Sequence, residues 1–197
     1  MRIGVLAVQG DVREHAAALA RVGVEPVPVR RVSELEAVAG IVLPGGESTT
    51  IDKLLRAFGL FEPLRQRLED GMPALGSCAG MIMLARDLVG GIEGQRSLGV
   101  LPMTVRRNAF GRQVDSSEVI VDWLPDGSQM HATFIRAPWV EAHDPEVEVL
   151  ATTLDAQGVE RVVAVRHASV IATAFHPEIS GDDRVHRMLV ELARTTQ

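Results

Sequence analysis

The first half of the chain alternates short apolar runs with segments of helical periodicity. The apolar runs cover residues 3–8, 27–29, 40–43 and 73–76. Runs of this kind are typical of strands that are covered on both faces, because such strands lose the in-and-out alternation of a half-exposed sheet. Regular strand–helix alternation predicts a parallel sheet with right-handed crossovers.

Polar and glycine residues mark the ends of the intervening helices. Asp11 is predicted as the N-cap of the first helix, with Glu14 three residues later as in a capping box, and Gly23 ends it. The apolar stripe of this helix is Val12, His15, Ala16 and Leu19. Further helices are expected over residues 50–57 and 63–69 and from about Ala79.

The second half is predicted to be mostly β-structure. Strand-like runs cover residues 100–106, 117–121, 133–135, 147–152, 162–165 and 170–175, and a last amphipathic helix closes the chain. Short turns between these runs indicate an antiparallel or mixed extension of the sheet. We therefore expect one α/β domain over residues 1–197, flavodoxin-like, with a mostly parallel central sheet and an antiparallel extension in the C-terminal half.

Composition narrows the class of partner. The 197 residues carry a net charge of −6, with acidic and basic positions interspersed. No basic tract is present to neutralise phosphates, which argues against nucleic acid and anionic membranes as main partners. No apolar run approaches the roughly 18 residues of a membrane span, and residues 3–8 are too short for a secretory signal. A cytoplasmic protein is expected.

The one cysteine lies in the pentapeptide GSCAG, residues 76–80. A single cysteine excludes an internal disulfide and a multi-cysteine metal site. The form G-x-C-x-G between a strand and a helix is that of a nucleophile elbow, where small neighbours permit a strained turn. The Ala79 N–H would then face a developing oxyanion. The pentapeptide alone fits a buried cysteine in a tight turn equally well.

A base for Cys78 is predicted in the tripeptide His176-Pro177-Glu178. Pro177 favours an extended His176, and in extended chain Glu178 would lie on the same side as the imidazole and orient it. The alternative is a histidine at a strand end followed by a surface acid. Among the other histidines, His15 and His186 are expected in solvent on helices, and His131, His143 and His167 have no acidic partner at a telling position.

The loop PGGEST, residues 44–49, is the third candidate for chemistry. Two glycines allow backbone N–H groups to turn inward as an anion nest, which suits an oxyanion or a phosphate. A Walker loop is excluded because no lysine follows the glycines. The same residues would also suit a tight turn in which Ser48 or Thr49 caps the next helix.

Together, the motifs PGGES, GSCAG and FHPE resemble those of class I, triad-type glutamine amidotransferases. Further blocks are similar to the glutaminase subunit of pyridoxal 5′-phosphate synthase. These blocks are Gln9-Gly10, residues 13–15, GGESTT at 45–50, residues 107–116 and residues 134–138. The resemblance runs from Met1 to the last helix and implies the three-layer fold of that family.

The resemblance also implies roles for individual residues. Cys78 would be the nucleophile, His176 the general base and acid, and Glu178 the orienting carboxylate. Glutamine would be bound by Gly46, Glu47, Ser48, Arg107, Ile135 and Arg136. Backbone N–H groups of Gly45, Gly46 and Ala79 would form the oxyanion hole, and Gln9 would lie where a partner subunit docks. Residues 90–97 and 122–129 match no family block and are expected to contribute nothing to the site.

The activity that the resemblance implies is hydrolysis of L-glutamine to L-glutamate and ammonia through a γ-glutamyl thioester. The ammonia would pass to a synthase subunit in a large hetero-oligomer, which makes pyridoxal 5′-phosphate from a pentose phosphate and a triose phosphate. Pyridoxal 5′-phosphate is then a product of the complex and not a cofactor of this chain. Neither an organic cofactor nor a metal is expected in this chain. Two alternatives are a stand-alone hydrolase or stress protein of the same fold, and a non-catalytic module with Cys78 as core packing.

Overall fold

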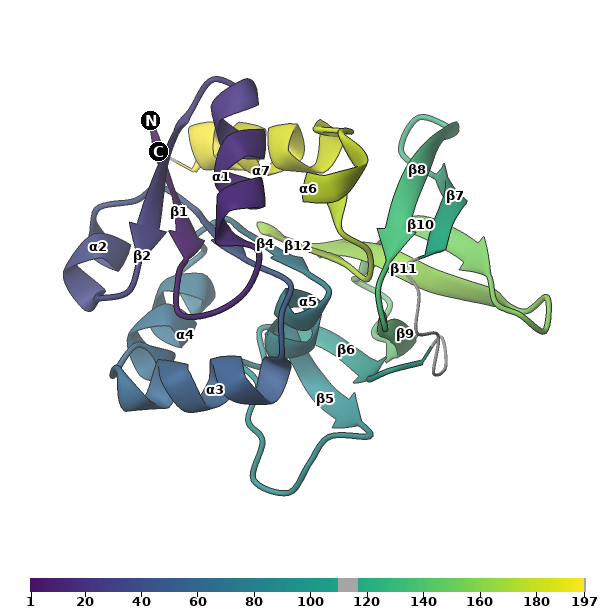
Figure 1. Ribbon diagram of the computed structural model, residues 1–197, viewed down its shortest axis with the longest axis horizontal. Helices are drawn as coiled ribbons and strands as arrows, with labels where there is room; N and C mark the ends of the chain where they lie inside the picture. Colours follow the sequence, from purple (N-terminus) through teal and green to yellow (C-terminus); the bar gives the residue numbers. More distant parts are fainter. Residues whose placement is uncertain (110–116, 197) are drawn as a thin grey trace.

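The computed structural model describes residues 1–109 and 117–196 (Figure 1). The remainder of the family block at 107–116, from Phe110 onward, lies outside the described residues. Helices cover both faces of a twisted sheet that extends through the molecule. The two described ends of the chain lie close together beside the first strand.

Among the described residues, five adjacent strands form the central parallel part of the sheet, in the order β2-β1-β3-β4-β12. They are β1 (Arg2–Leu6), β2 (Glu25–Val29), β3 (Ile41–Leu43), β4 (Ala74–Ser77) and β12 (Val170–Thr173). β2 contains Pro26 and Pro28 and lies at the edge, where a missing N–H is tolerated. The predicted flavodoxin-like parallel sheet is confirmed.

The sheet continues from β12 through antiparallel neighbours, as expected for the C-terminal half. These strands are β11 (Glu160–His167), β10 (Glu148–Leu154), β7 (Ser117–Trp123) and β8 (Ser128–Phe134). A branch joins β5 (Ala85–Val89), β6 (Leu101–Arg106) and β9 (Trp139–His143) to β11. β5 and β9 are not predicted by the sequence pattern, because their polar residues hide the alternation expected of a strand.

Two groups of helices enclose the parallel strands (Figure 1). One group comprises α1 (Val12–Arg21), α6 (Pro177–Ser180) and α7 (Arg184–Thr195), and the other α3 (Ser48–Ala57), α4 (Phe61–Glu69) and α5 (Ala79–Leu84). A short α2 (Val32–Glu36), which the sequence pattern does not predict, follows β2. The capping box predicted for α1 is wrong, because the Asp11 side chain makes no capping hydrogen bond.

The hairpin turn between β11 and β12 has no glycine. A glycine turn is expected there, but the sequence has Ala168 and Ser169. Ala168 adopts a φ of +50°, in the left-handed region that glycine occupies without cost. Alanine thus performs the turn at some expense of backbone strain.

The carboxyl ends of β3, β4 and β12 lie next to one another. Leu43 pairs with Gly76, and Ser77 pairs with Thr173. The Cys78 N–H continues the ladder by donating to the Thr173 carbonyl at 2.8 Å. The three candidate motifs follow these strand ends, so the sheet brings them to a single edge, where open α/β folds bind ligands.

The glycines of GSCAG are required by packing. A Cβ at Gly80 would collide with the Leu43 carbonyl oxygen, and one at Gly76 would lie 2.6 Å from the Gly80 carbonyl carbon. Both contacts are with backbone, which cannot move aside as a flexible side chain does. The elbow is therefore in direct contact with β3.

Gly80→Ala is expected to destabilise the fold by about 1–3 kcal/mol, because the added methyl group overpacks the elbow against β3. The measurement is the free energy of unfolding in urea. Gly91→Ala is the matched control, since its Cβ would meet Leu88 at an ordinary 3.7 Å. Equal stability of the two variants would contradict the packing argument.

Candidate active site

Cys78 sits at a sharp turn between β4 and α5. Its φ of +49° and ψ of −101° lie outside the regions that a non-glycine residue normally adopts. Such strain persists only where the surroundings impose it, and it is concentrated at functional sites. Cys78 is 7% exposed, and its sulfur lies 3.9 Å from the Ile135 carbonyl oxygen. The backbone geometry is that of the predicted nucleophile elbow.

His176 and Glu178 are hydrogen-bonded, with 2.7 Å between Nδ1 and Oε1. The predicted side-by-side placement is correct, but its reason differs from the expected extended chain. His176 is the N-cap of α6, Pro177 is the first helical residue, and Glu178 lies in the first turn. The His176 N–H donates to the Thr133 carbonyl at 3.0 Å, which ties this segment to the end of β8.

The hydrogen bond to Glu178 fixes the tautomer of His176. An ionised carboxylate only accepts, so Nδ1 carries the proton and donates it. Nε2 is buried and makes no hydrogen bond of good geometry to any residue the structure describes. It is therefore the nitrogen left to exchange a proton with a reacting group.

Electrostatics favour the charged imidazole. Burial opposes the positive charge, but the neighbouring side chains of Cys78 and Glu178 outweigh it and raise the pKa of His176 to about 10. Because this pKa lies above the usual value for histidine, the imidazolium persists at neutral pH and is lost as the pH rises through about 10.

A cavity of about 390 Å³ opens in front of Cys78. The three motifs PGGEST, GSCAG and FHPE all contribute to its lining, together with other segments. The lining residues are Gln9, Asp11, Gly46, Glu47, Ser48, Cys78, Ala79, Ile82, Arg107, Asn108, Ile135, Arg136 and His176. Glu178 lies behind His176, and Gly45 lies beside the imidazole, where a Cβ would come within 2.9 Å of Nδ1. The structure thus brings together all the residues for which the resemblance implies a role.

Arg107 is held at the cavity by a side chain that the sequence did not single out. Its Nη1 donates to Gln95 Oε1 at 2.6 Å, and Gln95 Nε2 donates to Ser48 Oγ at 3.1 Å. The expectation that residues 90–97 contribute nothing to the site is therefore wrong. Arg107 Nε is buried without a partner among the described residues, so this guanidinium retains a donor for a ligand.

Glu47 has three partners at the mouth of the cavity, Thr49, Thr50 and Arg107. As the N-cap of α3 it accepts from the N–H groups of Thr49 and Thr50, at 3.1 and 2.7 Å. Partial burial opposes ionisation of the carboxyl group, but these hydrogen bonds outweigh it and lower the Glu47 pKa. The alternative cap by Ser48 or Thr49 is wrong. Glu47 Oε1 also lies 3.3 Å from Arg107 Nη2.

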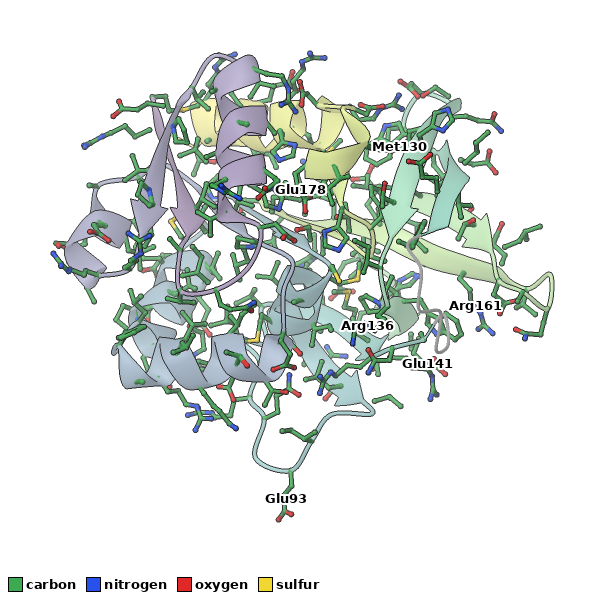
Figure 2. The ribbon with its side chains drawn as sticks, viewed as in Figure 1. Glu93, Met130, Arg136, Glu141, Arg161 and Glu178 are labelled. Carbon is green, nitrogen blue, oxygen red and sulfur yellow. The ribbon has the colours of Figure 1, made fainter. Side chains whose placement is uncertain are left out.

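Gln9 reaches the glycine loop from the end of β1. Its Oε1 accepts from the Glu47 N–H at 2.9 Å. A Cβ at Gly46 would come within 3.0 Å of the Gln9 amide carbon, so a larger residue there would displace the Gln9 side chain. Arg136, which follows the end of β8 (Figure 2), also lines the cavity and has a φ of +45°.

Asp11 is a site residue that the sequence pattern assigned to helix capping alone. Its Oδ2 lies 3.5 Å from His176 Nδ1. Among residues 1–109 and 117–196, Asp11, His176 and Glu178 offer three potential metal-ligand atoms that lie within 4.8 Å of one another. Two of these atoms are already hydrogen-bonded to each other, as a base and its orienting acid require.

Two further histidines lie behind the triad. His15 and His186 were expected in solvent, and this is wrong, since both are fully buried. The predicted apolar stripe of α1, which includes His15, correctly indicates the buried face of this helix. Both histidines have charged neighbours in the sequence, and the prediction of exposure is based on these neighbours. Those charged side chains point away from the core, whereas the histidines point into it.

The comparisons with known proteins agree with this geometry. The profile of the SNO glutamine amidotransferase family matches residues 5–195. The chain is 59% identical to the pyridoxal 5′-phosphate synthase subunit PdxT of Acidothermus cellulolyticus, over 97% of this chain and 93% of that protein. It is 61% identical to the PdxT subunit of Nocardia farcinica, over 98% and 85% of the two chains.

A solved structure extends the similarity to three dimensions. The crystal structure of a glutamine amidotransferase superimposes with a TM-score of 0.88 and 47% identity, covering 98% of each chain. Fold, site geometry and sequence agree, and the chain belongs to the SNO glutamine amidotransferase family.

Proposed function

We propose that this chain is a glutaminase subunit that hydrolyses L-glutamine and supplies ammonia to a pyridoxal 5′-phosphate synthase subunit. The observation that carries the proposal is a strained, buried Cys78 at a 390 Å³ cavity that also contains His176, whose Nδ1 is 2.7 Å from Glu178. Family membership and the names of the relatives support the choice of substrate and partner.

The reaction begins with the thiolate of Cys78. Sulfur attacks the side-chain amide carbon of glutamine, a C–S bond forms, and the carbonyl oxygen becomes an oxyanion. Backbone N–H groups of Ala79 and of the Gly45–Gly46 turn stabilise that oxygen. The imidazolium of His176 donates its Nε2 proton to the departing nitrogen, and the C–N bond breaks. Ammonia departs, and a γ-glutamyl thioester remains on Cys78.

The second half-reaction uses the same histidine. His176 is now neutral, and Nε2 accepts a proton from water as the water attacks the thioester. The C–S bond then breaks, and Cys78 leaves as a thiolate beside the re-formed imidazolium. Glu178 holds the ring in one tautomer through both steps, which is the role of the third member of a triad.

Glutamine is held at its amino-acid end by the remaining cavity residues. Arg107 and Arg136 offer cations for the α-carboxylate, and Arg–carboxylate pairs are strong and directional. Glu47 offers a carboxylate for the ammonium group. Ser48, the Gly46 backbone and Ile135 complete the site, while Gln95 holds Arg107 against Ser48.

The partner is the synthase subunit, which would dock near Gln9 and use ammonia with a pentose phosphate and a triose phosphate.

Every step above uses residues of this chain, without a metal or organic cofactor. One domain spans residues 1–197, and the protein acts in the cytoplasm. Among the described residues, no helix has the length and apolar character needed to cross a membrane.

Glutamate release by the full chain, with and without its synthase subunit, tests the proposal. We expect release that rises when the subunit is added and falls at least about 10³-fold in Cys78→Ser, because the nucleophile is lost. A glutamine-analogue electrophile should alkylate Cys78. Glutamate release that is the same with and without the synthase subunit would favour a stand-alone hydrolase. Absence of Cys78 labelling, even in the complex, would exclude catalysis by this residue.

The pH dependence of kcat/KM follows from the raised pKa of His176. Glu178→Gln removes a negative neighbour, so that pKa falls and the alkaline limb of the profile moves to lower pH. Glu146→Gln makes the same chemical change at an exposed position and is expected to leave the profile unchanged. An unshifted alkaline limb in Glu178→Gln would refute the assigned role of the carboxylate.

A further inference from the structure

A buried polar cluster joins three helices and a strand behind the triad. It consists of His15 on α1, Ser77 at the end of β4, Glu178 on α6 and His186 on α7. His15, Ser77 and His186 are fully buried, as is the Glu178 side chain. Figure 2 shows Glu178 where α1 approaches α6. Four buried polar side chains in one place need mutual hydrogen bonds to offset their desolvation.

His15 is the centre of this cluster, because both of its ring nitrogens are in contact with other members. Nε2 lies 2.9 Å from Ser77 Oγ and 3.3 Å from Glu178 Oε2. Nδ1 lies 3.0 Å from His186 Nε2. Ser77 is covalently bonded to the nucleophile Cys78, and Glu178 orients the base. His15 therefore touches both halves of the catalytic machinery.

The contacts select one tautomer for each histidine. If His186 Nε2–H donates to His15 Nδ1, then His15 carries its proton on Nε2, facing Ser77 and the Glu178 carboxylate. The opposite arrangement would turn the lone pair of His15 Nε2 toward that carboxylate. It would also leave a buried N–H on His186 Nδ1, an atom without a partner among the described residues. An orphaned donor and a repulsive contact both disfavour it.

His15 is also neutral in this environment. Burial lowers its pKa well below the ordinary value, and the neighbouring rings of His186 and His176 lower it further. Burial likewise lowers the pKa of His186 to about 4, where Asp183 opposes the shift and Arg21 adds to it. Arg21 and Asp183 are paired with each other at 2.7 Å, between α1 and the start of α7. The cluster thus contributes N–H dipoles rather than charge.

We infer that His15 is a positioning residue of the glutaminase reaction, with its tautomer set by His186. Its Nε2–H donates to the Ser77 hydroxyl and lies 3.3 Å from Glu178 Oε2, so its dipole holds the carboxylate beside the nucleophile's strand. Glu178 Oε1 accepts from His176, and Oε2 has no hydrogen bond of good geometry to a described residue, so the His15 N–H at 3.3 Å is an electrostatic contact. This inference rests on the proposed function, since it assigns His15 to the same reaction.

The consequence concerns the chemical step rather than glutamine binding. His15 lies behind Glu178 and does not line the cavity. Without its N–H, the buried carboxylate can move away from His176, and the imidazole loses its fixed tilt. Displacement of a reacting group by about 1 Å can cost about 100-fold in rate.

Two substitutions at position 15 separate positioning from packing. His15→Gln retains an N–H near the place of Nε2, whereas His15→Met fills similar space without a donor. In the complex with the synthase subunit, we expect kcat to fall roughly 10- to 100-fold in His15→Met with KM little changed. We expect His15→Gln to recover most of that loss. Equal kcat in both variants, whether low or unaltered, would overturn the inference.

A second measurement needs neither activity nor a variant. Long-range ¹H–¹⁵N spectra of the full chain with ¹⁵N-labelled histidine report which ring nitrogen carries the proton. We expect a neutral His15 with the proton on Nε2, unchanged between pH 8 and pH 6. A proton on Nδ1, or a doubly protonated ring at pH 7, would overturn the inference. Failure of the proposed function would instead appear as no glutamate release by the wild-type complex, with the spectra unaffected.

Discussion

The parallel pairing of β4 with β12 is the constraint on which the site depends. In sequence Cys78 and His176 are almost a hundred residues apart, yet their strands are neighbours, with Ser77 opposite Thr173. One backbone hydrogen bond, from the Cys78 N–H to the Thr173 carbonyl, fixes where the elbow begins. β3 lies on the other side of β4 and delivers the glycine loop to the same edge. The sheet therefore brings the nucleophile, the base and the glycine loop to a single edge.

Burial gives this arrangement its electrostatic character. Glu178 is withdrawn from water and hydrogen-bonded to His176 at 2.7 Å, which stabilises the imidazolium against the cost of burying it. Behind the carboxylate there is a neutral imidazole rather than solvent or a cation. A cation there would compete with His176 for the charge of Glu178, whereas the N–H of a neutral His15 would hold the carboxylate and leave that charge available.

Local sequence patterns predict much of the fold and of the catalytic triad. They do not predict the contacts between side chains that lie far apart in the sequence. The parallel strands, the elbow at Cys78 and the pairing of His176 with Glu178 each follow from a few consecutive residues. Gln95 and His15 do not, because their partners lie far away in sequence: His15 meets His186 across 171 positions and Ser77 across 62. Asp11 shows the same limit, since its helix-capping pattern concealed a place beside His176. Ala168 shows the converse, where the sheet imposes a left-handed turn on a residue that does not favour it.

The central claim is that Cys78 forms a covalent bond to the substrate. Its most direct test is the mass of the chain after rapid acid quenching of the complex during glutamine turnover, followed by peptide mapping. The account predicts an added γ-glutamyl group on the peptide that carries Cys78, removed by hydroxylamine as a thioester should be and not formed by Cys78→Ser. Turnover with no such adduct, or with an adduct at another residue, would contradict it.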